Sequence, residues 1–264
     1  MLIRQTALVL GVLACAWTAH ADVTLVAQMK GKMMGMNPSG ETITYIKGNK
    51  MRTDQTTGRD KTSTIMDVDG GRMITIHHGK KEAEVWNMAD LSATLQKGGV
   101  DVAGAVVKIT PTGQTKEIAG HQAAEHDISV SIDAAIPDAP VKMTMTISGP
   151  AFLSPSAPGA KDYTAFYLNA AEKGFFFGDP RTARAQPGNA RGMMQMYRDM
   201  ASKGIPLESK QTIKMSGSGP MAGLLSKMGG GEMSTTVTSV SDTTIDAALF
   251  EIPAGYKVKE QKVK

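Results

Sequence analysis

The feature that most restricts the fold of this chain is a series of short alternating segments separated by turn residues. Val23, Leu25 and Ala27 alternate with other side chains, and a period of two is typical of a β-strand with one buried face. Turn signals such as Gly48-Asn49 and Asp69-Gly70-Gly71 separate the segments. The predicted strands are residues 23–29, 42–46, 51–53, 63–68, 72–78, 82–87, 106–110, 114–118, 125–132, 141–148, 207–215, 232–240 and 250–252. Their regular spacing predicts a mainly β (α+β) fold, either a curved antiparallel sheet or an incomplete β-barrel covered by a few helices.

Residues 149–204 interrupt the strand pattern and are expected to form an insert. Three prolines, Pro150, Pro155 and Pro158, predict a loop over residues 149–159. A first helix is then predicted around residues 163–171, with Asp162 as its N-cap and Gly174 as its C′ residue. Its apolar face would carry Tyr163, Phe166, Tyr167, Ala170 and Ala171, which lie at helical spacing.

A second helix is predicted from about residue 191 to residue 203, where Gly204 and Pro206 would end it. Its apolar stripe would carry Met193, Met196, Tyr197 and Met200. Weaker helical signals occur at residues 90–96 and 221–228.

The first 21 residues have the build of a secretory signal peptide. Arg4 supplies the positive charge, residues 7–17 are apolar, and Ala19-His20-Ala21 is a small-x-small cleavage site. We therefore expect export to a periplasm, with residues 22–264 forming one β-rich domain. Cys15 is the only cysteine and lies in the segment that would be removed. It also ends a loose lipobox match, so lipid anchoring at Cys15 is an alternative that the sequence favours less.

Charge and motifs exclude several classes of function. Without Arg4 the chain has 28 basic and 25 acidic residues, a net charge of +3 from the totals of 29 and 25. Its basic residues form only short clusters, which does not predict a nucleic-acid interface. One cluster, expected to be a solvated tail, consists of Lys257, Lys259, Lys262 and Lys264. No second apolar stretch after the signal peptide is long enough for a transmembrane helix. No catalytic motif and no cofactor motif is recognisable, so the sequence predicts a protein without enzymatic activity.

Three segments resemble a bacterial exported family of unknown function, which is close to the LolA/LolB-like lipoprotein-carrier fold. They are Gly48-Asn49-Lys50-Met51-Arg52, the hairpin at Ile118-Ala119-Gly120-His121 with Glu125-His126, and the closing Leu249-Phe250-Glu251-Ile252-Pro253-Ala254-Gly255-Tyr256. The resemblance implies an antiparallel sheet whose apolar concave face is covered by helices. It implies no reaction and no particular site residue. The insert at residues 149–204 is longer than the family pattern.

Aromatic residues concentrate in the insert, and this predicts an apolar groove between its helices and the sheet. The candidate ligand-binding residues are Tyr163, Phe166, Tyr167, Phe176, Met193, Met196 and Met200. Ordinary packing of two helices on a sheet would place the same side chains inside. A carrier of apolar ligands would satisfy both interpretations.

The high methionine count, 19 residues, supports a second hypothesis. Clustered thioethers in an exported protein can bind soft metals such as Cu(I), and Met33, Met34 and Met36 form such a cluster. The histidines give weaker support for a metal site. His77 and His78 would point to opposite faces of a strand. His121 and His126 have no third ligand at a recognisable spacing.

These observations predict a periplasmic, non-enzymatic binding protein whose partner is an apolar small molecule or lipid. The alternatives are a methionine-rich copper-binding protein and an envelope module that binds another protein through a sheet edge.

Overall fold

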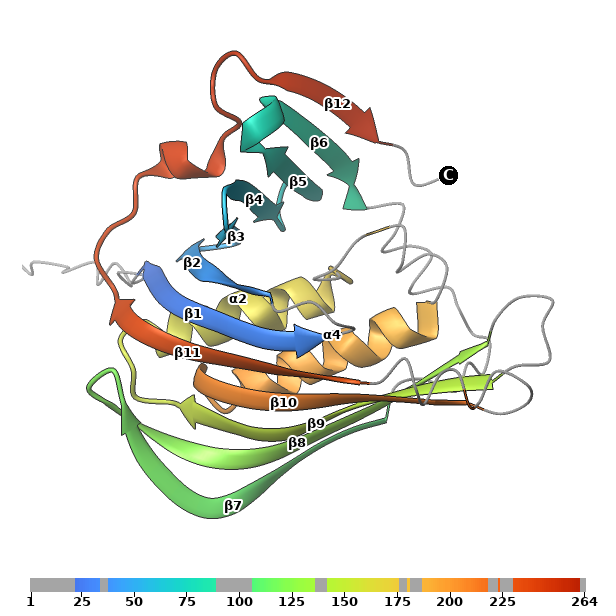
Figure 1. Cartoon of the computed structure of the whole chain (residues 1–264). Helices are drawn as coiled ribbons and strands as arrows, with labels where there is room; N and C mark the ends of the chain where they lie inside the picture. The colour runs from blue at the N-terminus through green and yellow to red at the C-terminus, as the bar shows by residue number, and fades with distance from the viewer. Residues whose placement is uncertain are drawn as a thin grey trace, which may run out of the picture.

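The computed structural model describes residues 22–33, 38–88, 106–135, 142–175, 187–217 and 230–261, with the single residues 180 and 223. It confirms the predicted class, since 62% of the described residues are in strands and two helices accompany one open sheet (Figure 1). The sheet has twelve strands in the order β12-β6-β5-β4-β3-β2-β1-β11-β10-β9-β8-β7. All neighbouring strands are antiparallel except β12 and β6, which are parallel.

The strands are β1 (Val23–Met33), β2 (Ser39–Lys47), β3 (Lys50–Thr57), β4 (Asp60–Asp67), β5 (Arg72–His77), β6 (Glu82–Asn87), β7 (Val106–Ile118), β8 (His121–Ala135), β9 (Lys142–Ser154), β10 (Ile205–Gly217), β11 (Gly231–Ser241) and β12 (Lys257–Gln261). Two short 3-10 helices, η1 (His78–Lys80) and η2 (Ala247–Phe250), lie in connections. Most of these strands extend the predicted ones by a few residues. The two strands predicted at residues 106–110 and 114–118 are one strand, β7, with an irregular register between Pro111 and Thr115.

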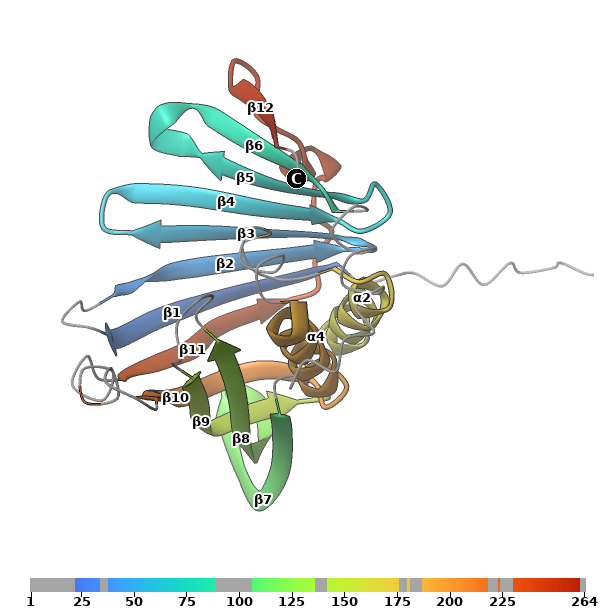
Figure 2. The same ribbon diagram turned by 90° about the vertical axis from the view of Figure 1, so that its right-hand side faces the viewer.

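Helices α2 (Ala160–Glu172) and α4 (Pro187–Ala201) both lie on one face of the sheet, near one end of its strands (Figure 2). We call this the inner face and the opposite one the outer face. Helix α2 ends as predicted: Gly174 has a φ of 73°, and the amide of Phe175 donates to the carbonyl of Ala170, which is a Schellman ending. The predicted N-cap was wrong. The cap residue is Gly159, and Asp162 lies in the first turn, where a carboxylate favours the helix dipole.

The predicted loop at residues 149–159 was wrong in its first half, because β9 continues to Ser154. Pro150 cannot donate a hydrogen bond to a neighbouring strand. Gly149 and Pro150 have no direct partner in the register with β10, and the side-chain amide of Gln211 donates to both of their carbonyls, at 3.2 Å each. The strand therefore passes through this irregular point.

The C-terminal prediction also needs correction. The strand predicted at residues 250–252 is wrong, because residue 250 ends η2 and residues 251–252 follow it without forming a strand. Residues 257–261, expected to be a solvated basic tail, form β12. Their partner is β6, which is far away in the sequence, so no local sequence pattern predicts the pairing. The helical signals at residues 90–96 and 221–228 fall outside the described residues, apart from Gly223.

Candidate functional site

A row of apolar side chains crosses the inner face of the sheet. The register pairs Ile46 with Met51, Met51 with Met66, Met66 with Met73, and Met73 with Trp86. Directly opposed residues in a sheet point to the same face with closely spaced Cβ atoms. We call Met51, Met66 and Met73, flanked by Ile46 and Trp86, the methionine row. All five side chains are buried.

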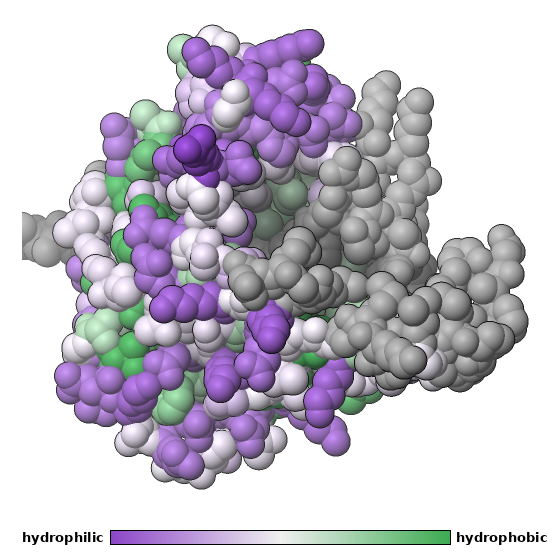
Figure 3. Space-filling model, viewed as in Figure 1, coloured by the Kyte–Doolittle hydropathy of each residue, from purple (hydrophilic) through white to green (hydrophobic). Residues whose placement is uncertain are grey.

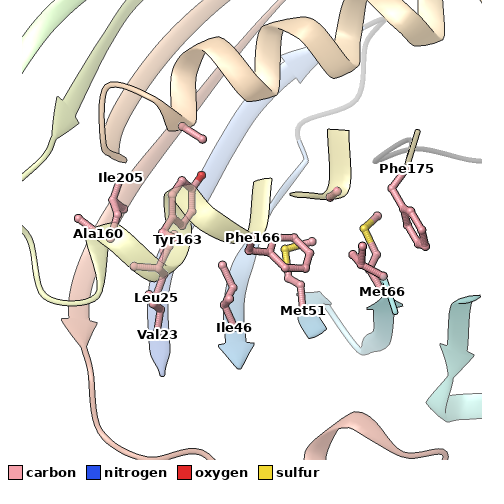
Figure 4. Packing of buried hydrophobic residues seen from close by; sticks show 14 of the residues in the cluster. Val23, Leu25, Ile46, Met51, Met66, Ala160, Tyr163, Phe166, Phe175 and Ile205 are labelled. Atoms are coloured by element: carbon pink, nitrogen blue, oxygen red, sulfur yellow. The ribbon is translucent and has the colours of Figure 1, made fainter. Parts of the chain in front are cut away.

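Helix α2 presents its apolar face to one end of this row. Figure 4 shows Tyr163 and Phe166 of α2, and then Phe175, facing the side chains of β1 to β4. Phe166 is almost completely buried, at 1% exposure, and belongs to the same cluster as the row. In the view of Figure 3 the described surface is mostly polar, with hydrophobic residues in small separate groups. The apolar material of this region is therefore inside the molecule.

Tyrosines connect the two helices and the methionine row. The hydroxyl of Tyr167 donates to Sδ of Met51 at 3.7 Å, and its ring stacks on Tyr197 of α4 with centroids 6.1 Å apart. Tyr163 packs against Tyr167 at 4.7 Å. Burial raises the pKa of Tyr163, Tyr167 and Tyr197. These phenols are neutral at physiological pH, so they offer hydrogen bonds and apolar rings without a charge.

Helix α4 forms a second apolar cluster with the other half of the sheet. Met196 is buried against β8 and β9, where Val130 and Leu153 have no exposed surface. Met193 and Met200 pack against the same cluster and are partly buried. Because methionine is flexible and polarizable, it can fill irregular space and adapt to changes in a partner's shape.

The outer face of strands β3 and β4, which carry Met51 and Met66 on their inner face, has a polar network. Arg52 donates to Asp54 at 2.6 Å and to Ser63 at 3.0 Å, and Ser63 donates to Asp54 at 2.7 Å. His78 lies 2.7 Å from Ser63 and 3.0 Å from the hydroxyl of Tyr256. We call these five residues the outer lock. Ser63 is fully buried and its neighbouring carboxylate contacts the serine instead of the histidine, so the set differs from a catalytic triad.

The outer lock holds the C-terminal segment 245–256 on the sheet. Arg52 also donates to the carbonyl of Leu249 at 2.7 Å. Ile245 and Phe250 are buried against Ile65, Ile74 and other outer-face residues. The structure thus joins two segments that carry the family resemblance, since the strand containing Met51-Arg52 lies beneath the closing residues 249–256.

The structure places most of the predicted site residues in two adjoining apolar clusters, one for each helix. Tyr163, Phe166 and Tyr167 lie on α2, and Met193, Met196 and Met200 lie on α4, all facing the sheet side of the helices. Phe176 falls outside the described residues. So do Met34, Met36 and the side chain of Met33, so the copper hypothesis at that cluster stays a prediction. In the described part of the chain, no group of three or more His, Cys, Asp and Glu side chains could hold a metal ion.

The sequence analysis missed the methionine row and Trp86. Each residue occupied an inward position of a predicted strand, but the row exists only through the register between strands. The turn at Gly48-Asn49 pairs Lys47 with Lys50 and hence Ile46 with Met51. Counting outward from this turn and from the turn at residues 68–71 would have found most of the row.

Strand β7 leaves one edge of the sheet without a partner strand among the described residues. Pro111 and the irregular register between Pro111 and Thr115 interrupt this edge. Proline, bulges and lysines such as Lys108 are devices that oppose edge-to-edge pairing. No described helix has the length and hydrophobicity of a membrane span.

Comparisons with known proteins found matches among solved structures only. No family model and no curated protein matches the chain. Solved structures that match include PNGF-II, with 11% identity, 91% of this chain and 31% of that chain covered, and a TM-score of 0.37. The chain thus spans less than a third of the length of PNGF-II.

Two further matches cover most of both chains. A putative outer membrane lipoprotein-sorting protein domain from Vibrio parahaemolyticus has 7% identity, coverage of 88% and 90%, and a TM-score of 0.28. A DUF1329 family protein from Desulfovibrio piger has 9% identity, coverage of 89% and 91%, and a TM-score of 0.27. The neighbours thus include a lipoprotein-sorting domain, the class that the sequence resembles, but TM-scores below 0.5 do not establish a common fold.

Proposed function

We propose that the protein is an exported, non-enzymatic binding protein that holds an apolar lipid or acyl ligand between the inner face of its sheet and helices α2 and α4. The observation that carries this proposal is the methionine row. Three flexible thioether side chains lie side by side in the same apolar cluster as Phe166, and Met51 accepts a hydrogen bond from Tyr167. Such a layer can repack around an inserted chain at lower cost than a layer of rigid branched side chains.

Burial of apolar surface would supply the binding free energy, at about 25 cal/mol per Å² removed from water. Tyr163 is buried, Tyr167 and Tyr197 are partly buried, and neither these tyrosines nor the row carries a charge. A charged group would therefore be disfavoured inside the layer. The proposal therefore restricts the inserted part of the ligand to hydrocarbon.

Native mass spectrometry of protein purified from its own periplasm, followed by solvent extraction, tests the proposal. We expect a stoichiometric lipid or acyl species. A clean apo mass that added lipid does not change would contradict the proposal.

Paired substitutions locate the site. Phe166→Asp and Met196→Asp place a carboxylate in the layer and should abolish uptake of a fluorescent acyl probe. Ala165→Asp and Gln195→Asp change exposed neighbours on the same helices, so they should leave uptake unchanged. Circular dichroism checks that each variant is folded. If the buried variants fold and still take up the probe, the ligand binds elsewhere.

A further inference from the structure

The outer face carries an unexplained group of lysines where β1, β11 and β10 lie side by side. The register pairs Lys30 with Ser234 and Ser234 with Lys210. All three side chains therefore point to the same face, with the serine between the two lysines. Lys32, two residues beyond Lys30, points the same way and is opposite Glu232.

These side chains line a hollow of about 200 Å³, together with Gly31 and Met233. Its walls carry three ammonium groups and one carboxylate, a net charge of +2. Elsewhere in the described chain, lysines on the sheet often have acidic partners: Lys47 pairs with Asp22, and Lys116 pairs with Glu208, at 2.7 and 2.8 Å. Lys30, Lys32 and Lys210 form no ion pair with the described residues, although Glu232 is directly opposite Lys32.

Lys30 and Lys210 lie two strands apart with Ser234 between them, and Lys32 lies two residues from Lys30 on the same face. Their flexible side chains can therefore bring three ammonium groups to one anion. The ammonium group of lysine is a common ligand for phosphate. The hydroxyl of Ser234 donates to the carbonyl of Lys30 over a long 3.3 Å, and it can exchange this bond for one to an anion. The charged lining residues are exposed, so added salt should weaken the attraction between an anion and the lysines.

We infer that the hollow between Lys30, Lys32, Lys210 and Ser234 is a binding site for a phosphate-class oxyanion, either free or as the head group of a lipid. The site is on the outer face, and the proposed acyl site is on the inner face. The two proposals can therefore fail independently.

Isothermal titration with inorganic phosphate at low ionic strength tests the inference. K30Q/K210Q removes the two lysines that flank Ser234, and K108Q/K161Q removes the same charge from exposed positions elsewhere. We expect K30Q/K210Q to bind phosphate at least about tenfold more weakly than the wild type, and K108Q/K161Q to bind as the wild type does. E232Q should bind more tightly, because it removes the only acidic group of the hollow.

Co-sedimentation with phosphatidylglycerol vesicles distinguishes the two sources of phosphate, with phosphatidylcholine vesicles as the control. Sedimentation that K30Q/K210Q abolishes identifies a lipid head group. Phosphate binding without sedimentation identifies a free anion. Absence of both, or equal losses in K30Q/K210Q and K108Q/K161Q, would overturn the inference. Uptake of the acyl probe should be unchanged in all of these variants.

Discussion

The two faces of strands β3 and β4 use different physical chemistry on alternating residues. Met51 and Met66 on the inner face make apolar contacts without directional preference, whereas Arg52, Asp54 and Ser63 on the outer face make directed hydrogen bonds. Apolar contacts can be exchanged for contacts with a ligand, but a buried ion pair cannot move without leaving a charge unpaired. The comparison suggests that the outer face fixes the sheet while the inner face is free to adapt.

The largest loss in the free energy of unfolding should come from a substitution that removes a member of the outer lock. Asp54→Ala leaves the buried guanidinium of Arg52 without its carboxylate. Removing one partner of a buried ion pair typically costs about 3–5 kcal/mol, and urea denaturation should show a loss of this size. Lys61→Gln is the control, since the exposed partner of Asp54 should contribute at most about 1 kcal/mol. Equal losses in the two variants would show that the lock does not fix the sheet.

The stability that the inner face contributes should depend on the volume of its side chains more than on their sulfur atoms. Met66→Ala creates a cavity in a buried position and should cost about 2–5 kcal/mol. Met66→Leu keeps the volume and should cost less than about 1.5 kcal/mol. Acyl binding should survive the leucine substitution. Loss of binding in Met66→Leu, together with Ag(I) binding by the wild type alone, would instead favour a soft-metal role for the row.

A smaller loss in the free energy of unfolding is expected when the hydroxyl of Tyr167, which connects α2 to the methionine row, is removed. Tyr167→Phe removes the hydrogen bond to Met51 but keeps the ring. A typical intramolecular hydrogen bond contributes about 0.5–1.5 kcal/mol, so thermal or urea unfolding should show a loss in that range. Leu168→Ala, at a more exposed position of α2, should have little effect. A larger loss in Leu168→Ala would contradict the assignment of the helix faces.

The smallest effect should be a pH dependence of the free energy of unfolding. It should arise from a group on the outer face alone. Burial lowers the pKa of His78 below its ordinary value of 6.5, and the charges of Lys61 and Arg52 lower it further, against an opposing effect of Asp54. The unfolded chain therefore binds a proton more readily than the folded protein. The free energy of unfolding should fall as the pH drops below 6.5.

Replacement of His78 by Gln should flatten this part of the pH profile, measured by urea denaturation between pH 7.5 and 5.5. His77→Gln is the matched control, because His77 is on the inner face and outside the outer lock. A profile that His77→Gln flattens and His78→Gln leaves unchanged would place the titrating group on the wrong face.

Asp54 should cause a second decrease in the free energy of unfolding, at lower pH. Burial raises the pKa of this carboxyl, but hydrogen bonds from Arg52 and Ser63 more than offset that effect and lower it below 3.8. Its contribution to stability should be complete above pH 3.8 and decrease below that value.

The same contrast explains what could be predicted from the sequence. Hairpins such as β2–β3 were predictable because the turn at Gly48-Asn49 and the alternation of the flanking strands agree. The helix faces followed from the spacing of Tyr163, Phe166 and Tyr167.

The outer lock was not predictable, because Arg52 meets Leu249 across 197 residues of sequence. Leu249, Phe250 and Ile252 look like strand residues, but their partners on the outer face determine a 3-10 turn and an irregular segment instead. The lysines of β12 suggest a solvated tail, yet Lys259 pairs with Glu82 at 2.6 Å. In each case a distant contact outweighs the local pattern.

The most direct test of the proposed ligand layer uses Trp86, the only tryptophan outside the predicted signal peptide, because it flanks the methionine row. Tryptophan fluorescence of the mature protein should be quenched by brominated fatty acids in a saturable manner, and unlabelled acyl chains should reverse the quenching. Saturable quenching that Phe166→Asp abolishes in a folded protein would support an acyl ligand beside the row. An acyl ligand that binds with normal stoichiometry and leaves Trp86 unquenched would contradict it.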